Sequence, residues 1–193
     1  LGDARFLPFY QEAERQRLPI FVHAQDPTGA DRFTGAPVHQ NLIGFPQENV
    51  LAAATLITGG VIERCPLLKV LFSHGGGGFS LVLPRLEQGW HTMGRWLPKR
   101  PSDYVRNFYF DTLLYDAAAV RFLIERFGPQ RVMVGSDYPF VIREVPPGRH
   151  LQEVTIAFVK MLLSFNEDIY AFRTAEKDEG YIKITPKELR EPF

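Results

Sequence analysis

Three residues that can bind a metal or move a proton lie where short apolar runs end. His23 follows PIFV, His74 follows VLFS, and Asp137 follows VMVGS. Imidazole nitrogens and carboxylate oxygens are suitable ligands for a catalytic Zn²⁺ or a similar divalent ion, which keeps one position open for water. If the runs are parallel strands, their carboxyl ends share the edge of the sheet where active sites assemble. The pattern therefore predicts a metal site built from separate strands.

Each of these residues also has a purely structural interpretation. A single histidine at a strand end is commonly hydrogen-bonded scaffolding, and Asp137, two residues before Pro139, is also suited to cap a following helix. The joint occurrence on successive strands brings the metal site level with the scaffolding interpretation, and both stay open at this point.

Four apolar runs, rich in β-branched and aromatic residues, alternate with segments of helical spacing. Nearly continuous hydrophobic strands separated by helices are typical of buried parallel strands in βα units. The sequence therefore predicts an α/β fold with a parallel sheet. The expected strands are 19–24, 69–74, 108–112 and 131–137, and the expected helices are 6–17, 48–65, 117–128 and about 150–165.

Two loops follow the first two expected strands. The segment 26–47, which carries His39, is long enough to be a binding segment or lid. The run HGGGGFS at 74–80 has four glycines, which allow positive φ or close approach of a ligand. Its amides before a helix are suited to an anion, but taken by itself the run favours a tight strand-to-helix turn. It lacks the residues of a phosphate-binding P-loop or a dinucleotide fingerprint.

The composition limits the class of protein. The chain has 193 residues, with 22 Lys and Arg against 22 Asp and Glu, so its formal net charge is zero and gives no basic excess for nucleic acid. A hydrophobic content of 45% supports a packed core, and no apolar run is long enough to span a bilayer. The single Cys65 excludes an internal disulfide. With no secretory signal in its opening residues, we expect a soluble cytoplasmic protein.

The segments FVHAQD, GGVIERCPLLKV, SHGGG and GSDYPF resemble the amidohydrolase-related (amidohydrolase 2) family. Within the family they are most similar to the aminocarboxymuconate-semialdehyde decarboxylase type, from about residue 5 to about 165. The resemblance implies a metal-dependent (β/α)8 TIM barrel, of which this chain is the C-terminal half with strands 5–8. It also implies non-oxidative decarboxylation of a small unsaturated or aromatic carboxylic acid.

The same resemblance implies a role for each matching residue. His23 and Asp137 match metal ligands, His74 matches the catalytic histidine, and Asp137 also belongs to the catalytic group. Arg85, in LPRLEQGW, matches an arginine that reaches the site of a neighbouring subunit and binds the substrate carboxylate. The implied cofactor is a divalent metal, with zinc expected first and manganese as the alternative.

One departure from the family pattern limits these expectations. The His-x-His metal pair of the family's first strand does not occur in these 193 residues. We therefore expect a partial barrel at 1–165, a charged tail at 166–193 with a possible lone strand at 181–185, and a homo-oligomer, most simply a dimer. A hydrolase or hydratase on the same barrel, and a non-catalytic binding or assembly protein, stay open beside the decarboxylase.

Overall fold

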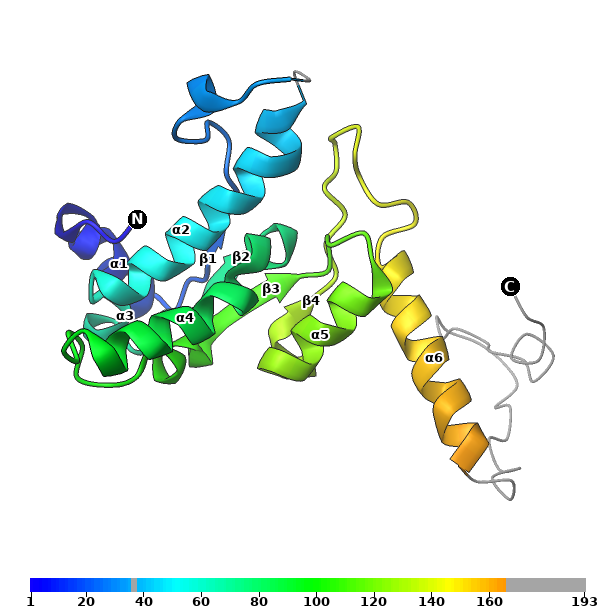
Figure 1. Ribbon diagram of the computed structural model, residues 1–193. Coiled ribbons are helices and arrows are strands. Elements are labelled where there is room, and N and C mark those ends of the chain that lie inside the picture. Colours follow the sequence, from blue (N-terminus) through cyan, green and yellow to red (C-terminus); the bar gives the residue numbers. More distant parts are fainter. Residues whose placement is uncertain (36–37, 166–193) are drawn as a thin grey trace.

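The computed structural model describes residues 1–35 and 38–165, and its centre is a parallel sheet. The four strands lie in the order β1-β2-β3-β4, as Figure 1 shows. All neighbouring pairs are parallel, which confirms the prediction from the apolar runs. The predicted tail, with its possible strand at 181–185, lies outside the described residues. The strands are β1 (Ile20–Val22), β2 (Val70–Phe72), β3 (Phe108–Asp111) and β4 (Val132–Met133).

Helices precede and connect the strands. The single helix expected at 48–65 is divided into α2 and α3, because Gly60 adopts a left-handed conformation (φ 69°) between them. α2 also begins earlier than expected, with Pro46 in its first turn, where the missing N–H costs no hydrogen bond. The helices are α1 (Leu7–Arg15), α2 (Phe45–Thr58), α3 (Val61–Arg64), α4 (Phe79–Thr92), α5 (Ala117–Phe127) and α6 (Arg149–Phe165). None of the described helices is both long and apolar enough to cross a bilayer.

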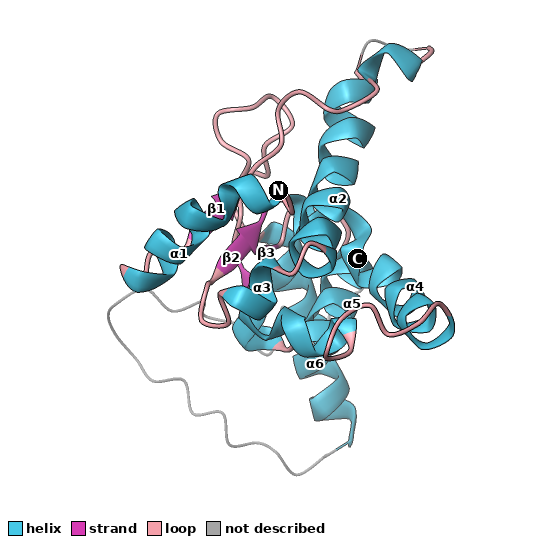
Figure 2. Ribbon diagram, turned by 90° about the vertical axis from the view of Figure 1, so that its left-hand side faces the viewer, coloured by secondary structure: helices cyan, strands magenta, loops and turns pink. Residues whose placement is uncertain are grey.

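One face of the sheet forms the hydrophobic core beneath α2, α4 and α5 (Figures 1 and 2). Phe72 of β2 and Phe108 and Phe110 of β3 are fully buried there. The ring centroids of Phe72 and Phe108 are 5.0 Å apart, and Phe110 stacks on Phe127 of α5 at 4.4 Å. Burial of each such side chain contributes about 2–3 kcal/mol, so this layer fixes the positions of the central strands.

The opposite face of the sheet is open at its two outer strands. Phe21 of β1 and Met133 of β4 are 58% and 48% exposed. Phe21 is in register with Leu71, which is in register with Tyr109, so these side chains lie in one row across the sheet. In a closed barrel, such a row faces the packed interior.

Candidate metal centre and catalytic histidine

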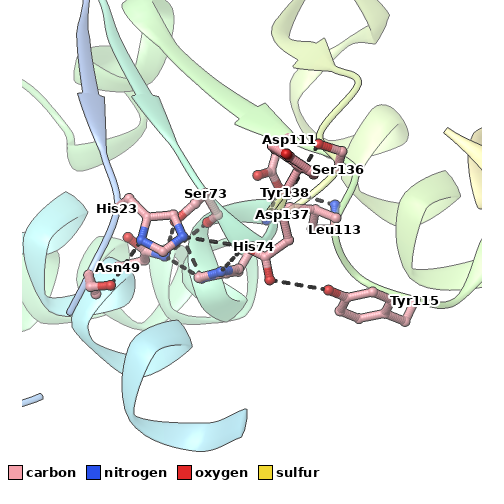
Figure 3. A network of polar contacts seen from close by, with 12 residues as sticks. His23, Asn49, Ser73, His74, Asp111, Leu113, Tyr115, Ser136, Asp137 and Tyr138 are labelled. Atoms are coloured by element: carbon pink, nitrogen blue, oxygen red, sulfur yellow. Dashed lines mark hydrogen bonds and ion pairs between the residues drawn. The ribbon is translucent and has the colours of Figure 1, made fainter. Parts of the chain in front are cut away.

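The structure brings His23, His74 and Asp137 together at the carboxyl edge of the sheet. His23 follows β1, His74 follows β2, and Asp137 lies beyond β4, and their possible ligand atoms all lie within 4.8 Å of one another. Oδ1 of Asp137 is 3.3 Å from Nε2 of His23 and 3.7 Å from Nε2 of His74 (Figure 3). The arrangement is that expected when parallel strands end at a common edge.

The donors and acceptors around His23 fit a bound cation. Nδ1 of His23 lies 2.9 Å from the carbonyl oxygen of Ala24, so in the neutral ring this nitrogen carries the proton and donates it. Nε2 then presents its lone pair to Oδ1 of Asp137, and two acceptors face each other at 3.3 Å. A metal ion between them removes the repulsion, and the ring has the tautomer that a ligating histidine needs. His23 and Asp137 therefore fit a divalent metal.

The second oxygen of Asp137 has a partner that is not among the predicted site residues. The hydroxyl of Tyr115 donates to Oδ2 of Asp137 across 3.5 Å. Burial, followed by the nearby charge of Asp137, raises the pKa of Tyr115 to about 12, so the hydroxyl keeps its proton at neutral pH. Tyr115 lies shortly after β3 at the same edge of the sheet. Its contact orients Asp137 while leaving Oδ1 directed at the two histidines.

His74 opens a short left-handed turn. His74 has φ 54°, and all four glycines that follow it also have positive φ. A Cβ on Gly77 would lie 1.7 Å from the carbonyl oxygen of Pro46, so the turn packs against the start of α2 with no side chain between them. The glycine run thus forms the tight strand-to-helix turn, which was one of the two interpretations. Because non-glycine residues rarely adopt this conformation, its occurrence at His74 indicates a position fixed by its surroundings.

A buried carboxylate holds this turn to the sheet. Asp111, the last residue of β3, is 4% exposed, and its Oδ1 accepts hydrogen bonds from the amides of Gly75 at 2.9 Å and Leu113 at 3.1 Å. Burial raises the pKa of Asp111 to about 6, although the backbone hydrogen bonds oppose the increase. The Gly75 amide is already engaged by Asp111, so it is not a free donor for a bound anion.

Aromatic rings border the metal-binding cluster. Phe140 stacks on His23 with the ring planes 7° apart and the centroids at 5.5 Å, and Phe45 contacts the same imidazole at its edge. Phe140 lies in GSDYPF, three residues after Asp137. These rings hold the orientation of His23 and give the cluster an apolar border.

The predicted residue Arg85 and two other reactive side chains, His39 and Cys65, lie outside the cluster. Arg85 is exposed on α4, and no hydrogen bond or ion pair engages it within residues 1–35 and 38–165. His39 packs against Phe33 with the ring centroids 6.4 Å apart, away from the three-residue cluster. Cys65 is completely buried at the end of α3, as expected of a core residue.

A parallel α/β sheet with two histidines and an aspartate at its carboxyl edge defines a class of proteins that build metal sites from strand ends. The particular family follows from comparison with known proteins. Residues 1–159 match the model of the Amidohydrolase family (Amidohydro_2), and the chain belongs to this family. The sheet is thus part of a (β/α)8 barrel of the amidohydrolase type.

Similar proteins support this assignment. The 2-amino-3-carboxymuconate-6-semialdehyde decarboxylase of Dictyostelium discoideum is 34% identical over 158 residues, which cover 80% of this chain and 44% of that protein. The crystal structure of 5-carboxyvanillate decarboxylase LigW from Sphingomonas paucimobilis is 30% identical, with a TM-score of 0.65 over 72% of this chain and 44% of that chain. This chain therefore spans less than half the length of these relatives.

A third similar protein is a dihydroxybenzoic acid decarboxylase from Polaromonas sp. JS666. Its structure contains bound manganese and the inhibitor 2-nitroresorcinol. It is 19% identical to this chain, with a TM-score of 0.65 over 88% of this chain and 57% of the other. This similarity shows the common fold.

Proposed function

We propose that this chain forms the C-terminal half of the active site of a metal-dependent decarboxylase, which acts without oxidation on a small aromatic or unsaturated carboxylic acid. The observation that carries the proposal is the pair of facing acceptors, His23 Nε2 and Asp137 Oδ1, with Nε2 of His74 directed at the same oxygen. This fold occurs in enzymes that catalyse many different reactions. The decarboxylase names of similar proteins support decarboxylation among them.

His23 and Asp137 would hold the metal ion. A divalent ion bound there supplies Lewis-acid polarisation of an oxygen ligand. The imidazole and carboxylate donors suit zinc, our first expectation, and manganese, which is supported by the Polaromonas protein. Two protein ligands fall short of the three that catalytic zinc sites usually have, so the complete site needs donors beyond His23 and Asp137.

His74 would transfer the proton. Burial lowers the pKa of His74, partly opposed by the charge of Asp137, so the imidazole is largely neutral near pH 7 and is competent as a base or a donor. His74 would take up a proton from water in the site and, as the imidazolium, deliver it to the substrate carbon that bears the carboxylate, which returns the ring to its neutral form. A C–H bond forms there, the bond to the carboxylate breaks, and its electron pair returns to the conjugated system as carbon dioxide leaves.

Arg85 would bind the substrate carboxylate in the site of a neighbouring subunit. Its guanidinium matches a carboxylate with two parallel hydrogen bonds, a geometry that lysine does not provide. Its exposed position on α4 leaves the side chain available to a second chain. This assignment rests on the resemblance of LPRLEQGW to the family sequence.

Release of carbon dioxide tests the proposal. The full chain is incubated with 5-carboxyvanillate or 2-amino-3-carboxymuconate-6-semialdehyde, the substrates implied by the names of two relatives, in the presence of Zn²⁺ or Mn²⁺. Because the chain supplies only part of the site, we expect slow release that requires metal in excess, which His74→Ala abolishes and the exposed control His91→Ala retains. Hydrolysis of an ester or lactone without carbon dioxide release would favour the hydrolase. Inactivity towards both substrate classes, with no metal uptake, would favour the binding or assembly protein.

A further inference from the structure

Asn49 is a completely buried polar residue on α2 that none of the roles above uses. Its side-chain nitrogen lies 3.0 Å from the carbonyl oxygen of Ser73, 3.0 Å from the Ser73 hydroxyl and 3.1 Å from Nδ1 of His74 (Figure 3). The Asn49 amide therefore lies directly behind the imidazole of His74, on the side opposite Asp137.

The carbonyl of Ser73 fixes which way the Asn49 amide faces. A carbonyl oxygen only accepts hydrogen bonds, so the atom beside it must be the amide nitrogen rather than the amide oxygen. The reversed amide would place two oxygens 3.0 Å apart. One amide hydrogen is thus directed at the Ser73 carbonyl, and the other is directed at the Ser73 hydroxyl and Nδ1 of His74.

These donors determine which nitrogen of the His74 ring carries the proton. The second group near Nδ1 is the Ser73 hydroxyl, at 3.3 Å, which also has a hydrogen to donate. A proton on Nδ1 would point at the hydrogens of the Asn49 amide, so Nδ1 is the acceptor and the ring proton lies on Nε2. His74 thus has the opposite tautomer from His23, whose Nδ1 donates to the carbonyl of Ala24.

Asn49 also keeps this position at a cost in free energy. Its Oδ1 is buried and has no hydrogen-bond partner among the described residues. A buried acceptor without a partner is rare, and an apolar side chain of similar size would avoid it. A residue that only filled space in α2 would have no need of the amide.

We propose that Asn49 is the positioning residue of His74: its amide holds Nδ1 as an acceptor, so that Nε2 carries the proton and faces Asp137. The inference rests on the proposed catalytic role of His74. It adds to that role a means by which the proton is kept on the nitrogen that faces the reacting groups.

The test is the tautomer of His74, read by ¹⁵N NMR of the imidazole nitrogens in the full, metal-free chain at a pH where His74 is neutral. We expect Nδ1 to be the unprotonated nitrogen in the wild type. Asn49→Asp replaces the donor with an acceptor and should move the proton to Nδ1. Ser73→Ala, which retains the amide, and Ala52→Gly, a control on the same helix, should leave the proton on Nε2.

Two results would overturn the proposal: a wild-type His74 with its proton on Nδ1, or a folded Asn49→Asp variant with the wild-type tautomer. If Asn49→Asp does not fold, Asn49→Ala combined with Ser73→Ala removes both donors and should give a measurable fraction of the Nδ1-protonated ring. An unchanged spectrum in that variant would contradict the role of Asn49. Because this measurement requires no substrate, loss of the proposed decarboxylation with the expected spectra would refute the function and leave the positioning intact.

Discussion

Nε2 of His23 and Oδ1 of Asp137 lie 3.3 Å apart, although 114 positions separate the two residues in the chain. His23 follows the first strand of the sheet and Asp137 lies beyond the last, so their meeting depends on all four parallel strands. The short distance joins an imidazole lone pair to a carboxylate oxygen, which is an arrangement that a cation stabilises.

We expect this chain alone to bind Zn²⁺ or Mn²⁺ weakly, with a Kd of roughly micromolar or higher, because only His23 and Asp137 are assigned as protein ligands. His23→Ala should weaken binding at least about tenfold, since it removes one of these ligands. Isothermal titration calorimetry of the two proteins measures this change. His39→Ala, outside the cluster, is the matched control and should bind as the wild type does. Tight, stoichiometric zinc in the His23→Ala variant would show that other residues form the site.

The buried carboxylate of Asp111 should make stability depend on pH. Its pKa in the folded protein, about 6, lies above the ordinary value of 3.8, so folding favours the protonated form. The resulting stabilisation is fully present below pH 3.8 and is lost as the pH rises through 6. Between pH 7 and pH 5 this group should add about 1 kcal/mol to the free energy of unfolding.

Asp111→Asn isolates this effect, because the amide oxygen can still accept from Gly75 and Leu113 but the side chain cannot ionise. Urea denaturation of both proteins at pH 5 and pH 7 gives the comparison. The difference in the free energy of unfolding between the wild type and Asp111→Asn should change by about 1 kcal/mol between pH 5 and pH 7. An equal pH dependence in both would show that Asp111 does not titrate in this range.

Substitution by alanine at two neighbouring glycines of the left-handed turn should reduce stability by very different amounts. At Gly77 the new Cβ would lie 1.7 Å from the carbonyl oxygen of Pro46, whereas at Gly78 no atom of residues 1–35 or 38–165 lies within 4 Å of it. Both positions have positive φ, so each alanine should cost about 1–2 kcal/mol in backbone strain. Gly77→Ala should cost more than about 3 kcal/mol in total, because α2 must also move. Thermal unfolding of the two variants measures these losses of stability. Equal losses in Gly77→Ala and Gly78→Ala would contradict the packing of the turn on α2.

The open face of the sheet predicts association. Phe21 and Met133 are exposed on the two outer strands, and exposed apolar faces and unpaired strand edges favour contact between chains. We expect a dimer or larger assembly in sedimentation equilibrium at micromolar concentration. Phe21→Lys should shift the equilibrium towards the monomer, while Leu67→Lys, at an exposed position outside the strands, should not. A 22.0 kDa monomer whose mass and stability are unaffected by Arg85→Ala would refute the assembly.

The strands and the three-residue cluster were predictable because their signal is local. An apolar run that ends in His23, His74 or Asp137 shows both the strand and the edge where it ends. The division between α2 and α3 was missed because the hydrophobic pattern continues across Gly59 and Gly60. Positive φ at Gly60 is a backbone property that the spacing of apolar side chains does not reveal.

The supporting residues could not be predicted in the same way. Asp111 lies within FYFDT, a pattern that indicates only a strand, since its partner, the amide of Gly75, is 36 positions away. Asn49 lies near the start of a helix, between Glu48 and an apolar run, where its sequence context gives no sign of a histidine behind it. Tyr115 does have a signal in the sequence, because it follows a strand that ends at the same edge as the cluster. The role of Arg85 stays a prediction.

The order of the strands also has a consequence for folding. β2 and β3 supply the middle of the sheet and its most deeply buried rings, whereas the proposed metal ligands belong to the two outer strands. A partly folded chain with only the central strands formed would leave His23 and Asp137 far apart. Local contacts form faster than contacts between distant residues, so the pair should be among the last features to assemble. Metal would therefore bind only after the whole sheet has formed. The ion would not stabilise a folding intermediate that lacks the outer strands.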